Sequence, residues 1–148
     1  MKVVSEIFKM PNGAFAPMFY CRREDGQIDQ DVTSTLLMAV EECTPAAIAS
    51  LAVLIDEVAA GTYVPHDPVL PDWGVNDKNF WFGPPYTKPH HVLISNENIE
   101  DYSIDHGKPQ EFSLDQVRAA LDHWRRFLET VRLSGKESFE GEKFESTI

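Results

Sequence analysis

Five histidines give this chain its most evident metal-ligand chemistry, and they are His66, His90, His91, His106 and His123. A helical zinc site usually takes two histidines four positions apart with a carboxylate nearby, and no such pair occurs here. His90 and His91 are adjacent, so on a strand their side chains point to opposite faces. We therefore expect no metal and no other cofactor, and we expect His123 at a solvated position on a helix.

Other catalytic arrangements are equally sparse. Asp105 and His106 resemble a dyad, but neighbours on an extended chain diverge, and a general base must reach its partner by a hydrogen bond. The sequence has no G-x-S-x-G elbow, no phosphate-binding loop and no dinucleotide fingerprint. Cys21 and Cys43 lack metal-type spacing, so we expect two free, buried thiols in a reducing compartment. These absences favour a protein that is not an enzyme.

The densest part of the chain is NFWFGPPYTKPHHVLISN, residues 79–96. Alternation places Trp81 on one face of a strand and Phe80 with Phe82 on the other, which predicts strands covered on both sides or nearly so. The prolines between the strands predict a stiff, extended loop. A second proline-rich segment, residues 62–79, is expected to run over the surface because prolines block regular strand pairing.

These two segments carry the candidate contacts for a partner. Rigid aromatic rings flanked by carboxylates suit a basic protein surface, because little conformational entropy is lost on binding. The candidates are Asp67, Asp72, Trp73, Asp77 and Tyr86, with Glu97, Glu100 and Asp101 as steering charges in the segment NENIED. The alternative is that both segments are irregular surface loops without a partner.

The charge balance favours a cationic partner. The 148 residues include 24 acidic and 13 basic side chains, which gives a net charge of −11. Such a field repels nucleic acid and anionic membranes, although acidity alone also keeps a protein soluble. No apolar run is long enough to cross a bilayer, and the N-terminal residues lack the apolar region of a secretory signal. We therefore expect a cytoplasmic protein.

Residue periodicity predicts an α+β domain, with a mostly antiparallel sheet and two main helices. Strands are expected at residues 3–8 and 16–22, joined at the Asn12-Gly13 turn, and again at residues 79–83, 90–95 and 99–104. Residues 32–42 fit both a strand and a helix, and the apolar spacing gives a weak preference for a helix.

Both main helices have clear ends. The first begins at Thr44 and Pro45 and ends at Gly61. Its apolar stripe consists of Ile48, Leu51, Ile55 and Val58. The second follows a capping box of Ser113 and Gln116 and ends at Gly135. Its apolar stripe consists of Leu114, Val117, Leu121, Trp124, Leu128 and Val131.

We expect residues 1–134 to form the single domain and residues 135–148 to form an acidic C-terminal tail. The tail contains ESFEG and EKFES, a short tandem that carries Phe139 and Phe144. Either the tail frays, as chain ends commonly do, or the two phenylalanines dock on the domain or on a partner.

The chain is small, acidic and poor in catalytic motifs, and YSIDHGKPQEFSLDQ predicts a strand, a turn and a capped helix near its end. In these respects it resembles the immunity proteins of bacterial toxin–immunity pairs, such as those of contact-dependent growth inhibition. The resemblance is one of type across the whole chain, and no residue role is carried over from it. It implies a binding protein that neutralises one cognate toxin, often a nuclease, whose basic cleft an acidic inhibitor can block.

Two other functions remain open from the sequence. A small metal-dependent hydrolase would need the scattered histidines to converge in one pocket. A structural or adaptor protein would use the C-terminal tandem as a docking segment. A large toxin gene directly upstream would favour the immunity function, whereas an operon of metabolic enzymes would favour the hydrolase.

Overall fold

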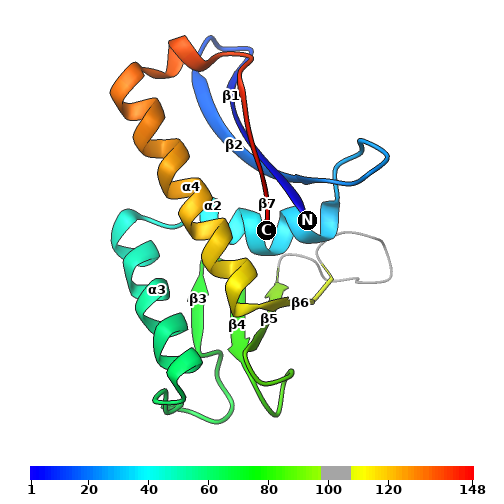
Figure 1. Ribbon diagram of the computed structural model, residues 1–148, viewed down its shortest axis with the longest axis vertical. Helices are drawn as coiled ribbons and strands as arrows, with labels where there is room; N and C mark the ends of the chain where they lie inside the picture. The colour runs from blue at the N-terminus through cyan, green and yellow to red at the C-terminus, as the bar shows by residue number, and fades with distance from the viewer. Residues whose placement is uncertain (98–107) are drawn as a thin grey trace.

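Two antiparallel sheets form the framework of the computed structural model, which describes residues 1–97 and 108–148 (Figure 1). The first sheet has the order β2-β1-β7, with β1 at Lys2–Lys9, β2 at Phe15–Arg22 and β7 at Lys143–Thr147. The second has the order β3-β4-β5-β6, with β3 at Trp73–Val75, β4 at Lys78–Phe82, β5 at His91–Asn96 and β6 at Gln110–Ser113. The α+β fold that the sequence predicted is confirmed.

Helices join and cover the sheets. Residues 30–41 form what we call the central helix, made of α1 (Gln30–Val32), a π-helical segment η1 (Thr33–Leu37) and α2 (Met38–Glu41). The other helices are α3 (Pro45–Ala60), α4 (Leu114–Ser134) and a 3₁₀ turn η2 (Lys136–Phe139). Figure 1 shows the central helix between the two sheets and α4 running along both of them.

Within the described residues, no single helix is long and apolar enough to cross a membrane. The central helix and α3 together have sufficient length and apolar content, but the chain bends by 113° between them.

The N-terminal hairpin forms as predicted. β1 and β2 pair over their full length, from Lys2 with Arg22 to Lys9 with Phe15. At the turn, the Asn12 side chain accepts a hydrogen bond from the backbone N–H of Ala14 at 3.0 Å. Gly13 has a positive φ of 86°, a conformation that glycine adopts without steric cost.

The preference for a helix at residues 32–42 is also confirmed. The Asp29 side chain caps the helix by accepting from the Val32 N–H at 3.1 Å. The hydroxyl of Thr33 accepts from the backbone N–H of Cys21 at 3.0 Å, which fastens the helix to the edge of β2. Leu36 and Leu37 are fully buried, so apolar burial outweighs the strand preference of the threonines.

α4 begins and ends as its sequence predicted. Ser113 and Gln116 form the complete capping box, and Gly135 follows the last residue with a φ of 82°. The buried stripe includes Trp124, whose ring stacks on Phe19 of β2 with centroids 5.2 Å apart. The helix thus packs its predicted apolar face against the first sheet and continues down to the second.

Part of the predicted surface loop at residues 62–79 is a hairpin instead. Trp73 pairs with Phe80 and Val75 with Lys78, with a tight turn between these strands. Asn76 in that turn has a φ of 49°, which asparagine tolerates better than most residues. Strand β6 was not predicted, and the strand expected at residues 99–104 lies outside the described residues.

Residues 135–148, which we expected to form an acidic C-terminal tail, include a strand of the first sheet. Lys143–Thr147 form β7, which pairs antiparallel with β1. Phe144 packs against Phe127 of α4 with centroids 5.4 Å apart, and Phe139 packs against Phe144 at 5.5 Å. Of the two interpretations open from the sequence, the structure has the phenylalanines docked on their own domain.

His123 is buried rather than solvated, with only 6% of its surface exposed. Its Nε2 lies 2.9 Å from the Ser5 hydroxyl of β1, and its Nδ1 lies 2.6 Å from the Ser146 hydroxyl of β7. Its ring also stacks on Phe19 of β2, with centroids 5.2 Å apart. One side chain of α4 therefore contacts all three strands of the first sheet.

We predict that Trp124→Ala lowers the free energy of unfolding by about 3–5 kcal/mol, as large aromatic truncations in cores do. Trp124 is 2% exposed and sits between Phe19 and Phe127. Arg125→Ala is the matched control, since this exposed neighbour should cost less than about 0.5 kcal/mol. Urea melts of both variants measure the difference, and equal losses would contradict the packing of α4.

We also predict that His123 makes the fold sensitive to acid. Burial, and next the charge of Arg126, lower the pKa of His123 in the folded chain. The unfolded chain, with a histidine pKa of about 6.5, therefore takes up the proton first as the pH falls. The stability that neutral His123 contributes is complete above about pH 6.5 and is lost as the pH falls toward the lowered folded value.

Urea melts at about pH 7.5 and about pH 5.5 test this prediction in wild type and in His123→Gln. The variant should be less stable at the higher pH and should lose less stability on acidification. His90→Gln, at an exposed histidine, is the control and should follow the wild type. An identical loss of stability in all three proteins would rule out His123 as the acid-sensitive group.

Candidate functional site

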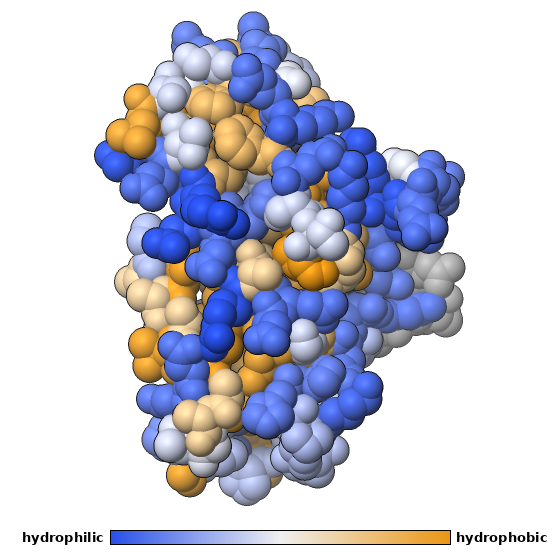
Figure 2. Space-filling model, viewed as in Figure 1, coloured by the Kyte–Doolittle hydropathy of each residue, from blue (hydrophilic) through white to orange (hydrophobic). Residues whose placement is uncertain are grey.

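The two proline-rich segments, residues 62–72 and 83–90, lie together at one end of the second sheet. The Tyr86 hydroxyl donates to the carbonyl of Pro68 at 2.8 Å, which joins one segment to the other. Figure 1 shows this end far from the first sheet, and Figure 2 shows a small strongly hydrophobic group at its edge among more polar residues. We call these two segments the two-loop surface.

The two-loop surface is held by internal hydrogen bonds. One carboxylate oxygen of Asp72 accepts from the Tyr63 hydroxyl at 2.6 Å, and the other accepts from the Phe82 N–H at 2.8 Å. Burial, and next the hydrogen bond to Asp72, raise the pKa of Tyr63, so its hydroxyl stays protonated and able to donate. Asp67 accepts from the backbone N–H groups of Val69 and Leu70 at 2.8 and 3.3 Å. The loops are thus fixed without a partner.

Four large apolar side chains project from this surface. Val64 is 75% exposed, Val69 79%, Leu70 61% and Tyr86 41%. A smaller exposed group, Phe8, Met10 and Met18, surrounds the tip of the N-terminal hairpin at 37% to 47% exposure. Exposed apolar side chains that gather in one place commonly mark an interaction site. The two-loop surface is therefore our candidate functional site.

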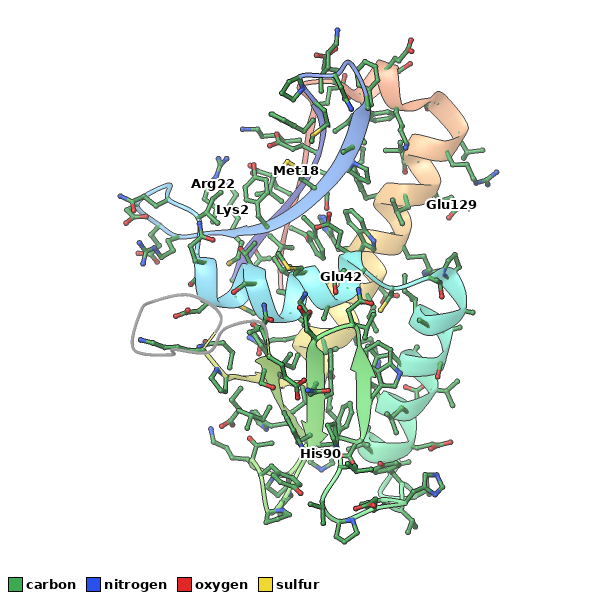
Figure 3. All side chains as sticks on the ribbon, turned by 180° about the vertical axis from the view of Figure 1, so that it is seen from behind. Lys2, Met18, Arg22, Glu42, His90 and Glu129 are labelled. Carbon is green, nitrogen blue, oxygen red and sulfur yellow. The ribbon has the colours of Figure 1, made fainter. Side chains whose placement is uncertain are left out.

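The surface continues onto the outer face of the second sheet. The Trp81 and Tyr86 rings have centroids 6.1 Å apart, and Trp81 pairs across the strands with Leu93. Both Trp81 and Leu93 are half-buried, whereas Phe80 on the inner face is fully buried. Figure 3 views the sheet from the side away from α4, with His90 at the two-loop end.

The opposite end of the same sheet holds a buried ion cluster. Lys78 is 2% exposed, and its Nζ donates to Glu42 at 2.8 Å and to Asp77 at 2.6 Å. Burial alone would lower the pKa of Lys78, but the hydrogen bonds to the two carboxylates raise it. The hydrogen bond from Lys78 in turn lowers the pKa of Asp77. This cluster joins the second sheet to the central helix, and Figure 3 shows Glu42 near the middle of the molecule.

The predicted contact residues therefore separate into groups. Asp67, Asp72, Trp73 and Tyr86 lie at the two-loop end, Asp77 and Glu97 lie at the opposite end, and Glu100 and Asp101 lie outside the described residues. Glu97 is exposed and accepts a hydrogen bond from Asn79.

Three of the predicted contact residues, Asp72, Trp73 and Asp77, are engaged within the fold. Asp72 and Asp77 are half-buried and hydrogen-bonded rather than freely exposed charges. The Trp73 ring is half-buried and meets Phe80 edge-on with centroids 5.0 Å apart, so it packs against the core. Sequence reasoning also missed Val64, Val69 and Leu70, whose only signal is their position inside a segment that prolines keep out of the sheet.

The histidines do not meet within the described part of the chain. His66 and His90 are exposed, His91 is half-buried at the start of β5, and His106 lies outside the described residues. Among residues 1–97 and 108–148, no group of three or more histidine, cysteine, aspartate or glutamate side chains is placed to hold a metal ion.

The two cysteines are free and buried, as predicted. Burial raises the pKa of Cys43 to about 11 and also raises that of Cys21. Both therefore stay as thiols at neutral pH, which is the form that makes a poor nucleophile.

Comparisons of the chain with protein-family models, curated proteins and solved structures found no match. The function is therefore inferred from the geometry of the two-loop surface. That surface combines exposed apolar side chains with a backbone that prolines and hydrogen bonds already hold in place. Such an arrangement suits contact with another protein, because little ordering is needed on binding.

We predict that Asp72→Asn lowers the free energy of unfolding by about 1–3 kcal/mol, because an amide can accept only through its oxygen and leaves one donor without its bond. Asp67→Asn is the control, since its amide oxygen can still accept from the two backbone N–H groups. Urea melts compare the variants. If Asp72→Asn matched the wild type, the hydrogen bonds of Asp72 to Tyr63 and Phe82 would not contribute to stability.

Proposed function

We propose that this chain is a binding protein that docks on a basic protein partner through the two-loop surface. More specifically, we propose that this partner is a toxin domain, which the chain neutralises in the cytoplasm, as expected from its resemblance to immunity proteins. The observation that carries the proposal is the group of four exposed apolar side chains on loops that are fixed before binding.

The apolar side chains would supply the short-range attraction. Fully burying one valine or leucine side chain contributes roughly 1.5–3 kcal/mol, so Val64, Val69 and Leu70 together offer a substantial gain. Tyr86 adds an aromatic ring whose hydroxyl already has a partner in Pro68. Tyrosine is common among the residues that dominate binding energy, and a ring held in advance loses little entropy.

The net charge of −11 would act at longer range. A negative field speeds the encounter with a positively charged partner and is screened by salt. Within the two-loop surface, Asp72 already accepts hydrogen bonds from Tyr63 and Phe82. The exposed Asp67 is therefore the carboxylate best placed to attract a basic partner. Charge should therefore govern how fast the complex forms, whereas apolar contact governs how long it lasts.

The structure gives less support to the two alternatives. An adaptor that docks through the C-terminal tandem would need Phe139 and Phe144, but both are half-buried against the domain. A hydrolase with converging histidines lacks a cluster among the described residues. We therefore develop the binding function.

We predict that the triple variant Val64→Ser, Val69→Ser, Leu70→Ser loses its partner. The immobilised protein would be exposed to a lysate of its source cells, and bound proteins would be identified by mass spectrometry. Tyr86 is retained so that its hydrogen bond to Pro68 persists. The matched control is Val53→Ser with Leu133→Ser, which removes helix side chains of 57% and 72% exposure elsewhere on the molecule.

Wild type and control should capture the same basic protein, and the triple variant should not. Surface plasmon resonance with the purified partner should then show association that slows as salt rises. Equal capture by all three baits, or capture of an acidic protein alone, would refute the proposed surface. Co-expression tests whether the partner is a toxin. Growth that the toxin arrests should be restored by the wild type and not by the triple variant.

A further inference from the structure

A hollow that the proposed function does not use lies between the start of α3 and the last turns of α4. We call it the α3–α4 groove, and its lining residues are Pro45, Ile48, Arg125, Leu128, Glu129 and Arg132. Its volume is about 340 Å³, which falls within the range of roughly 300–1,000 Å³ typical of small-molecule sites. In Figure 3, Glu129 lies on α4 near the start of α3.

The floor of the α3–α4 groove is apolar. Ile48 of α3 is 8% exposed, and Leu128 of α4 is half-buried against the same core. Pro45 adds its ring at the first position of α3, where it is exposed. An apolar body resting on these three side chains would exclude water from surface that is now wet, and this burial would favour binding.

The rim of the groove carries two arginines and one carboxylate. Arg125, Glu129 and Arg132 are spaced so that they lie along one side of α4. Arg125 meets Asp122 at 3.5 Å, but both side chains are more than half exposed, and such a pair contributes little. Within residues 1–97 and 108–148, Arg132 has no ion-pair partner. The N-terminus of the 16-residue helix α3 adds positive potential at the same place.

We propose that the α3–α4 groove binds a small organic carboxylate with an apolar body, such as a medium-chain fatty acid. The apolar chain would lie on Ile48 and Leu128. The carboxylate would lie between Arg125 and Arg132, whose guanidinium groups match its planar, two-oxygen geometry. Glu129 and the Asp122 partner of Arg125 offset the two arginine charges, so the carboxylate would be held by hydrogen bonds from the guanidinium groups.

Octanoate is a suitable probe for the full chain. Isothermal titration calorimetry measures its affinity, and amide chemical-shift mapping by NMR locates its site. Octanol keeps the chain without the charge, and acetate keeps the charge without the chain. Octanoate should bind and shift the amides of residues 46–48 and 125–132, whereas both control molecules should bind at least about tenfold more weakly.

The test variant is Arg125→Ala with Arg132→Ala, and Arg126→Ala is its control, because Arg126 is exposed on the same helix but does not line the groove. The double variant should weaken octanoate binding by about tenfold or more, and the control should leave it unchanged. Equal binding of octanol, shifts confined to other residues, or an equal effect of Arg126→Ala would overturn the proposal. None of these variants alters the two-loop surface, so failure here leaves the proposed function untouched.

Discussion

The fold depends on one helix that must cover two small sheets at once. Neither a three-stranded nor a four-stranded sheet of short strands can bury its apolar face alone, so each needs a helix packed against it. α4 has 21 residues and is therefore about 30 Å long, enough to reach both sheets. Its start is fixed without a loop, because Ser113 is both the last residue of β6 and the helix cap. Packing of Trp124, His123 and Phe127 on the first sheet then fixes its direction.

Local signals predicted the elements that local interactions determine. The Asn12-Gly13 turn, the Thr44 cap and the capping box at Ser113 each act within a few residues, and each forms as expected. Pairings between distant residues could not be predicted in this way, since β7 has no turn that directs it to β1. His123 was misjudged for a related reason. α4 lies against more than one layer, so its buried face is wider than the single stripe that its periodicity indicated.

The site shows the same division between local and distant effects. The proline-rich segments were identified because prolines exclude regular pairing whatever the tertiary context. Whether a carboxylate within them is free depends on partners elsewhere in the chain. Asp72 accepts hydrogen bonds from Tyr63 and Phe82, and Asp77 accepts one from Lys78, which the fold buries. Exposure of Val69 and Leu70 is likewise a tertiary property, because the same residues in a strand would have entered the core.

The place of β7 beside β1 has a consequence for how the chain is made. β1 is synthesised well before β7, its second partner, because the central helix, the second sheet and α4 lie between them in the chain. During synthesis, one edge of β1 therefore has its backbone N–H and C=O groups open to water or to other chains, while β2 already covers the opposite edge. Contacts between such distant residues form slowly, because a long loop must close before they are made. Until β7 arrives, Phe127 lacks its contact with Phe144, and the Nδ1 atom of His123 lacks the Ser146 hydroxyl.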